Sequence, residues 1–222
     1  MNMRTRCLFL AAAGFGSAVL ATAASAQGDP ADWDVCSTFP SGEPPEAVIA
    51  SCGRLLEVEG LTPEQRATPL YYRGSAYQVR QEWQLSIADF DEVIRLTPEE
   101  ANAFENRGYA YAMLGDHGRA IADYDRAIAI DPSDAYPLRL RGYSRSQREE
   151  YDTALADLDR AVAIDPQSAE GWHGRGRVRS LQQDWVRAIA DFDEAIRRDP
   201  QNGAYYSERG FARQENGDIA QA

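Results

Sequence analysis

Paired aspartates are the residues of this sequence whose spacing could most readily do chemistry, because carboxylates bind metal ions and transfer protons. Four Asp-x-Asp pairs recur 34 residues apart, at Asp89/Asp91, Asp123/Asp125, Asp157/Asp159 and Asp191/Asp193. Each pair lies in a segment whose apolar residues recur at helical spacing. Side chains two residues apart on a helix point about 200° apart, so the carboxylates of one pair do not converge on one ion. The pattern therefore predicts no metal site, and the aspartates need another explanation.

Other residues that commonly carry catalysis are few. His117 occupies a turn position that aromatic packing residues hold elsewhere, and His173 stands alone on its predicted helix without a nucleophile or carboxylate in register. The sequence contains no Gly-rich phosphate loop, zinc-ligand spacing or Gly-x-Ser-x-Gly motif. We therefore expect no catalytic residue, no cofactor and no metal.

The elements that carry these residues recur with a fixed period. Pro98, Pro132, Pro166 and Pro200 are 34 residues apart, and five Arg-Gly pairs beginning at Arg73 keep the same step. The period defines repeats at 67–100, 101–134, 135–168 and 169–202 and a partial repeat at 203–222. Each repeat predicts two amphipathic helices, the second of which ends before its proline.

The recurring positions identify the chain as similar to a known family. Repeat two carries the positions most fully, with Phe104, Gly108, Tyr111, Ala120, Tyr124, Ala127 and Pro132. This pattern resembles the tetratricopeptide repeat family. The resemblance implies an all-α, right-handed superhelical solenoid of antiparallel helix pairs over residues 67–222. Glycine inside a helix costs about 1 kcal/mol relative to alanine, so its recurrence predicts closely packed backbones.

Arginine and aspartate also recur in phase within the repeats. Position 7 is Arg in all five repeats, and position 23 is Asp in the four complete ones. We predict a ladder of partly buried ion pairs, Arg73–Asp89, Arg107–Asp123, Arg141–Asp157 and Arg175–Asp191. The alternative is that these charges are separately solvated.

The resemblance also implies a concave surface lined by first-helix residues. The candidate peptide-binding residues there are Tyr71, Tyr109, Arg139, Tyr143, His173 and Arg177. The first helices of repeats three and four are rich in arginine, which favours acidic peptide segments as ligands. Alternatively, these arginines neutralise acidic residues of neighbouring second helices.

The first 26 residues have the features of a cleaved secretory signal. Arg4 and Arg6 precede an apolar stretch, and Ala24-Ser25-Ala26 matches a signal-peptidase site; an uncleaved anchor is the alternative. Removing residues 1–26, which contain two Arg and no acid, changes the formal net charge from −12 to −14. Such an acidic chain is a poor binder of nucleic acid or anionic lipid, and no mature segment predicts a membrane span. We expect an exported protein, periplasmic or secreted.

Residues 27–66 fit the repeat poorly and predict a leader and a degenerate capping repeat, with a helix over 44–56. Cys36 and Cys52 are the two cysteines of the mature chain, and in an oxidising compartment they predict a disulfide. The sequence stops within the second helix of repeat five, which predicts either a fragment or a last helix that packs on a partner.

These observations predict a non-catalytic scaffold of the bacterial cell envelope that binds peptide or protein segments. The alternatives are a regulatory module of a larger enzyme and a structural subunit of an envelope complex. The sequence makes no prediction of the oligomeric state.

Overall fold

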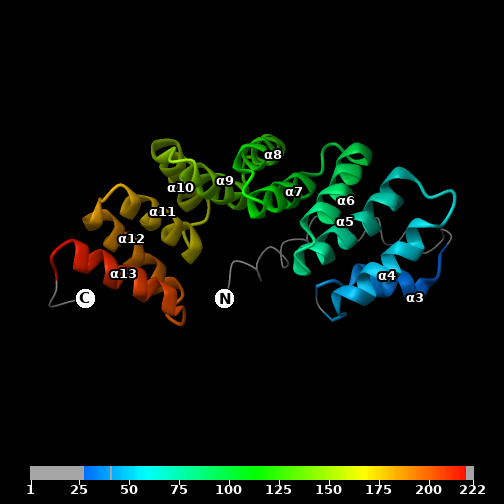
Figure 1. Cartoon of the computed structure of the whole chain (residues 1–222), viewed down its shortest axis with the longest axis horizontal. Helices are drawn as coiled ribbons and strands as arrows, with labels where there is room; N and C mark the ends of the chain where they lie inside the picture. The colour runs from blue at the N-terminus through cyan, green and yellow to red at the C-terminus, as the bar shows by residue number, and fades with distance from the viewer. Residues whose placement is uncertain (1–27, 41, 219–222) are drawn as a thin grey trace. The chain divides into compact units, whose positions relative to one another are not determined.

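The computed structural model describes residues 28–40 and 42–218, so the predicted signal peptide, 1–26, lies outside the described residues. The described chain is all-helical and contains no strand (Figure 1). Its helices, in order, are α3 (Pro30–Ser37), α4 (Pro45–Leu56), α5 (Pro63–Val79), α6 (Trp83–Leu96), α7 (Ala101–Met113), α8 (His117–Ile130), α9 (Ala135–Gln147), α10 (Tyr151–Ile164), α11 (Ala169–Leu181), α12 (Trp185–Arg198) and α13 (Gly203–Glu215). Consecutive helices pack as pairs, which confirms the predicted fold class.

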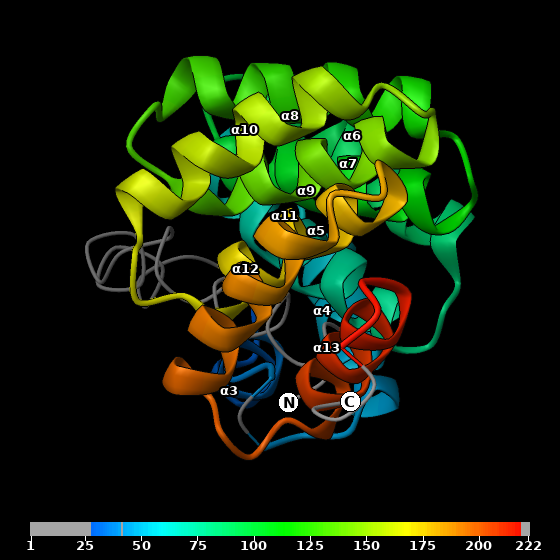
Figure 2. The ribbon, with the colours of Figure 1, turned by 90° about the vertical axis from the view of Figure 1, so that its left-hand side faces the viewer.

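The helices form two compact units, which divide between Ile130 and Asp131. In unit one, α3 packs on α4, α5 on α6 and α7 on α8. In unit two, α9 packs on α10 and α11 on α12, and α11 also contacts α13 (Figure 1 and Figure 2). No helix of the described residues combines the length and apolar character that a bilayer crossing needs.

In each of the four complete repeats, a glycine on the first helix packs against the second helix. A Cβ atom added at Gly108 would lie 2.8 Å from Cε1 of Tyr124 on α8, and one at Gly176 would lie 2.8 Å from Cε1 of Phe192 on α12. Both distances are shorter than a carbon–carbon contact allows. These glycines therefore lie where a side chain would not fit, as predicted, but an aromatic ring of the second helix fills the space rather than its backbone, and at Gly210 nothing described lies within 4 Å.

The turn between the two helices of each complete repeat contains a residue in the left-handed conformation. Gln81, Glu149 and Gln183 take this conformation, with φ of 61°, 62° and 61°, whereas repeat two has Gly115 at φ 80°. Glycine adopts positive φ without the steric cost that other residues meet. Three repeats therefore carry a modest strain that repeat two avoids.

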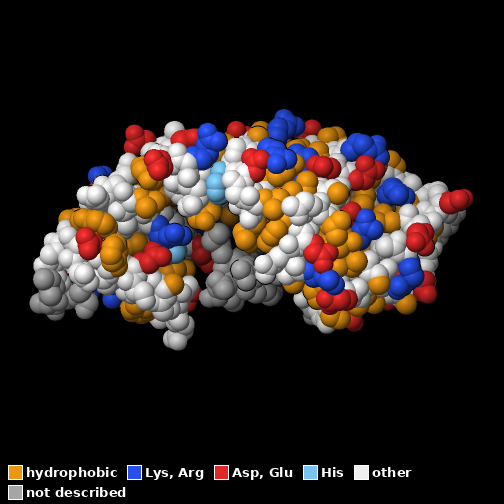
Figure 3. All heavy atoms as spheres, in the orientation of Figure 1, with side chains coloured by type: hydrophobic (Ala, Val, Ile, Leu, Met, Phe, Trp, Pro, Cys, Tyr) orange, Lys and Arg blue, Asp and Glu red, His pale blue; other side chains and the backbone are white. Residues whose placement is uncertain are grey.

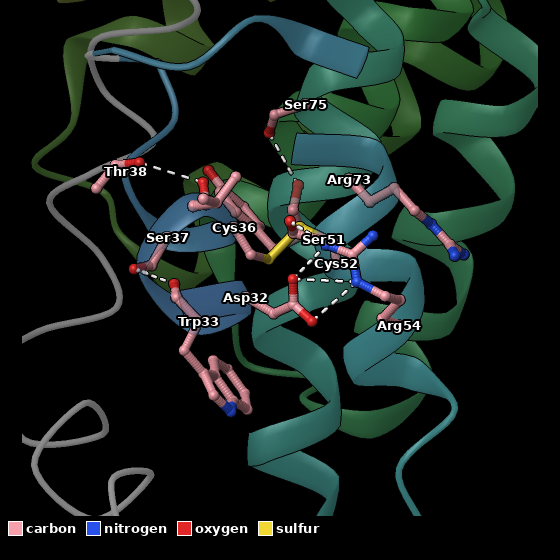
Figure 4. The surroundings of a disulfide bond; sticks show 12 residues. Asp32, Trp33, Cys36, Ser37, Thr38, Ser51, Cys52, Arg54, Arg73 and Ser75 are labelled. Atoms are coloured by element: carbon pink, nitrogen blue, oxygen red, sulfur yellow. Dashed lines mark hydrogen bonds and ion pairs between the residues drawn. A yellow bond between two sulfur atoms is a disulfide. The ribbon is translucent and has the colours of Figure 1, made fainter. Parts of the chain in front are cut away.

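The first helix pair contains the predicted disulfide (Figure 4). Cys36 on α3 and Cys52 on α4 are joined, with their Cα atoms 5.1 Å apart, and both are fully buried. Beside the bond, Nε of Arg54 donates to both carboxylate oxygens of Asp32 at 3.1 and 2.9 Å. The cysteines are 16 residues apart, the separation that also joins Gly108 to Tyr124. The contacting residues of α3 and α4 are therefore separated along the chain as in a repeat, although the segment does not match the repeat sequence pattern.

The first regular repeat begins earlier than the periodicity predicts. Helix α5 begins at Pro63, so it crosses the boundary that the sequence pattern places between residues 66 and 67. A capping box explains the early start: the Thr62 hydroxyl accepts from the backbone N–H of Gln65, and the Gln65 side chain accepts from the backbone N–H of Thr62. Proline at the first helical position adds to this start signal because its fixed φ suits a helix.

Candidate interaction surface on the first helices

The arginine–aspartate ladder determines which charges are available to a ligand. Arg107 donates from Nε to Oδ2 of Asp123 at 2.9 Å and from Nη2 to Oδ1 at 2.6 Å. The same contact between residues 16 apart joins Arg73 to Asp89, Arg141 to Asp157 and Arg175 to Asp191. The predicted ladder is confirmed in all four repeats, and separate solvation of these charges is wrong.

The ladder is partly buried, which decides its energetics. The Asp123 side chain is 7% exposed and that of Arg107 is 20% exposed. Burial raises the pKa of the Asp123 carboxyl, and the hydrogen bonds from Arg107 oppose this rise. The hydrogen bond to Asp123 is also the main cause that raises the pKa of Arg107. Because desolvation offsets much of the attraction, such a pair adds little net stability, but removing one partner strands a buried charge.

The second aspartate of three of the pairs, Asp91, Asp159 and Asp193, has a role that the sequence analysis missed. Arg107 on α7 extends Nη1 to Oδ1 of Asp91 on the preceding helix α6, at 2.6 Å. In unit two, Arg175 contacts Asp159 at 2.7 Å and Arg209 contacts Asp193 at 2.6 Å. Each Asp-x-Asp motif with both contacts thus links an arginine of its own repeat to an arginine of the next. The signal was present, because these arginines also lie 16 residues after their aspartates.

Further arginines of the first helices belong to the same network. Arg145 donates from Nη1 to Oδ2 of Asp157 at 2.7 Å, and Arg179 donates from Nη1 to Oδ2 of Asp191 at 2.7 Å. For these two residues, the interpretation that they neutralise second-helix acids is confirmed. They do not form a free basic surface. In Figure 3, basic and acidic side chains lie interspersed on the visible face rather than gathered by sign.

The two candidates in unit one are not exposed to a ligand. Tyr71 is fully buried, and its hydroxyl accepts from Nδ2 of Asn106 on α7 at 3.1 Å. Burial raises the pKa of Tyr71 well above its ordinary value. Tyr109 is also buried, and its ring meets the Trp83 ring edge-on at 6.0 Å between centroids. The expectation that these tyrosines line an open groove is therefore not met, because neighbouring helices cover both.

The four candidates in unit two occupy two equivalent pairs of positions. Arg139 and Tyr143 lie one helical turn apart on α9, and His173 and Arg177 lie 34 residues later on α11. Residues four apart share a helix face, and α9 packs against α11. All four are at least partly exposed. The structure thus places all four on the first helices of one unit.

The charged side chains of this group have different partners. The Arg139 guanidinium carbon lies 5.0 Å from the Tyr136 ring centroid, within the range of a cation–π contact. Nε2 of His173 lies 3.0 Å from Oε2 of Glu208 on α13. Nε of Arg177 lies 3.7 Å from Oε1 of the same carboxylate, and the Arg177 side chain is 45% exposed. We call Arg139, Tyr143, His173 and Arg177 the first-helix surface of unit two.

Within residues 28–40 and 42–218, no group of three or more His, Cys, Asp or Glu side chains is arranged to hold a metal ion. The Asp-x-Asp carboxylates contact arginines instead, as the preceding distances show. The arrangement can recognise ligands through hydrogen bonds, ion pairs and ring contacts.

The comparisons with known proteins agree with this architecture. Models of one family, described as tetratricopeptide repeat, match residues 71–135, 108–170 and 169–202. Together these matches run through more than half of the 222 residues. No curated protein sequence matches the chain at a significant level.

Solved structures share the fold at low sequence identity. MamA from Desulfovibrio magneticus RS-1, residues 41 to the end, is 22% identical, with TM-score 0.68, covering 80% of this chain and 99% of MamA. YrrB, described as a TPR protein with an unusual peptide-binding site, is 19% identical, with TM-score 0.64, covering 86% and 97%. The first TPR domain of Spaghetti (RPAP3), bound to the HSP90 peptide SRMEEVD, is 22% identical, with TM-score 0.50, covering 54% and 95%. By its repeat pattern, its helix pairs and these matches, the chain belongs to the tetratricopeptide repeat family.

Proposed function

We propose that the protein is a non-catalytic interaction scaffold of the bacterial cell envelope, and that its first-helix surface in unit two binds peptide or protein segments with acidic side chains. The observation that carries the proposal is Arg177. Its guanidinium is nearly half exposed and makes one ion pair at 3.7 Å, unlike the ladder arginines, whose hydrogen bonds to Asp are mostly below 3 Å. Arginine with open donors on a helix face is suited to carboxylates.

The neighbours of Arg177 extend the same chemistry. Arg139 and Tyr143 occupy the corresponding positions one repeat earlier and are partly exposed. A tyrosine on the same helix face as an arginine offers an aromatic ring to a peptide. The peptide bound by the similar RPAP3 domain, SRMEEVD, is itself acidic. These features support a peptide ligand with carboxylates.

The envelope setting rests on two features of the chain. The leader at residues 1–26 has a secretory pattern, and Cys36 and Cys52 form a disulfide, which persists in oxidising compartments. The test is to express the full sequence in a bacterium and fractionate the cells. We expect a periplasmic or secreted protein whose mature amino terminus is Gln27 and whose cysteines resist alkylation. Recovery of full-length reduced protein from the cytosol would contradict the setting.

The ligand class is tested with a double substitution. Arg139→Gln with Arg177→Gln should weaken binding of an acidic peptide by about 1–3 kcal/mol if both arginines make charged hydrogen bonds. The matched control is Arg187→Gln with Arg197→Gln, which likewise removes two positive charges, from more exposed positions on the second helix α12. Calorimetric titration at two salt concentrations measures both variants. Equal affinities of the two double variants would exclude the first-helix surface as the binding site.

A further inference from the structure

The first-helix surface of unit two already holds a carboxylate, which comes from the protein itself. Glu208 on α13 places Oε2 at 3.0 Å from Nε2 of His173 and Oε1 at 3.7 Å from Nε of Arg177. The two oxygens of one carboxylate thus face two basic side chains of α11. The structure shows by this contact that the space between His173 and Arg177 accepts a carboxylate.

The two basic side chains differ in how firmly they are placed. The His173 ring lies 4.7 Å from the ring of the buried Tyr205, centroid to centroid, and 6.0 Å from that of Phe192. Its side chain is 19% exposed, so packing holds the imidazole in position. Arg177 is far more exposed and makes the longer contact. The site therefore has a fixed imidazole and a guanidinium that can adapt to the carboxylate it meets.

Glu208 is not part of the ladder. It occupies position 6 of its repeat, where the other repeats have Tyr72, Asn106, Leu140 and Gly174. The equivalent contact in unit one, from Asn106 to Tyr71, has the same sequence separation of 35 residues but is buried. Glu208 is 36% exposed; its contact with His173 is partly buried, and its contact with Arg177, whose side chain is 45% exposed, lies at the surface. A surface ion pair of this kind is weak enough to exchange with a ligand.

We propose that Glu208 is an internal competitor: it occupies the position of a ligand carboxylate between His173 and Arg177, and an acidic side chain of the partner displaces it. This inference rests on the proposed function and adds a regulating residue to it. The ligand binds only the fraction of molecules in which Glu208 has left, so its apparent affinity falls in proportion to that fraction. Loss of a surface ion pair of ordinary strength corresponds to about a two- to five-fold gain in affinity.

The experiment uses the whole mature chain and a labelled hexaglutamate peptide as the probe, with hexaglutamine as the uncharged control peptide. Glu208→Gln should bind hexaglutamate about two- to five-fold more tightly than the unaltered protein. Glu215→Gln is the matched control, because it removes one negative charge from the exposed end of the same helix. Glu208→Asp keeps the charge but shortens the side chain by one methylene, so it should give a smaller gain. Fluorescence anisotropy measures the three variants at equal salt.

The outcomes separate this inference from the proposed function. If the unaltered protein binds hexaglutamate and Glu208→Gln binds it no more tightly than Glu215→Gln, the competitor is excluded while the binding surface stands. If only Glu208→Gln binds the peptide, both proposals are supported, and the gain should vanish when Arg177→Gln is added. If no variant prefers hexaglutamate to hexaglutamine, both proposals are wrong.

Discussion

Two glycines at the same position of their repeats make a sharp test of the packing argument. Gly108 lies inside α7 and Gly210 lies inside α13, eight residues into their repeats. A Cβ at Gly108 would lie 2.8 Å from Cε1 of Tyr124 and 3.1 Å from Cβ of Asp123. Among the described residues, nothing comes within 4 Å of a Cβ at Gly210. Substitution by alanine is therefore expected to change the free energy of unfolding in opposite directions at the two positions.

The magnitudes follow from two opposing terms. Alanine in place of glycine inside a helix contributes about 1 kcal/mol of stability. Overpacking a filled contact costs about 1–3 kcal/mol. Gly210→Ala should therefore stabilise by about 1 kcal/mol, because only the propensity gain applies. Gly108→Ala should range from neutral to about 2 kcal/mol destabilising, and Gly108→Leu should cost more.

Urea unfolding followed by far-UV circular dichroism compares the midpoints of the two alanine variants. Repeat proteins can unfold in parts, so hydrogen exchange of the α7 and α8 amides should accompany it. The decisive quantity is the difference between Gly108→Ala and Gly210→Ala, expected at about 1–3 kcal/mol. If both variants stabilise the protein equally, the contact between Gly108 and Tyr124 is not a packing constraint.

Three further experiments test other parts of the fold. Asp191→Asn should destabilise the protein by about 3 kcal/mol, because it leaves two arginines without their buried partner. Asp159, whose side chain is 57% exposed, is the comparison, and Asp159→Asn should cost less than about 1 kcal/mol. Similar urea midpoints for the two variants would exclude a special role for the buried aspartate. Replacing Cys36 and Cys52 together by serine should cost about 3 kcal/mol and loosen α3, measured by thermal unfolding and hydrogen exchange; unchanged exchange in α3 would show that the bond is dispensable. Gln183→Gly should be neutral to about 1 kcal/mol stabilising in urea, because glycine removes the cost of positive φ; a clear loss of stability would show that this turn depends on its side chain.

The period was enough to predict contacts within a repeat. Arg107 and Asp123 recur in phase at every step, so a mutual role followed from counting alone. The contact from Arg107 back to Asp91 was not predicted, because the expected ion pairs joined residues of one repeat only. The 16-residue separation from Asp91 to Arg107 also recurs in the other repeats. Interactions that keep the repeat spacing are therefore predictable from one sequence, including those between neighbouring repeats.

Exposure was harder to predict because it depends on residues that do not recur. Tyr71 and His173 occupy the same position of their repeats, and each meets a side chain 35 residues later. That partner is Asn106 in one case and Glu208 in the other, so one contact is buried between neutral side chains, whereas the other is partly exposed and joins an imidazole to a carboxylate. Position 6 varies in every repeat, and a pattern shared by all repeats carries no information about it.

The disulfide shows that the spacing between paired helices can be met by more than one kind of chemistry. A glycine facing an aromatic ring closes α7 on α8 and α11 on α12, and a cystine closes α3 on α4 at the same 16-residue separation. The two positions, 16 residues apart, can therefore carry either a glycine–aromatic contact or a disulfide. Cysteines placed at Gly176 and Phe192 should then graft the covalent closure onto unit two, giving that pair a connection that salt and protons do not weaken.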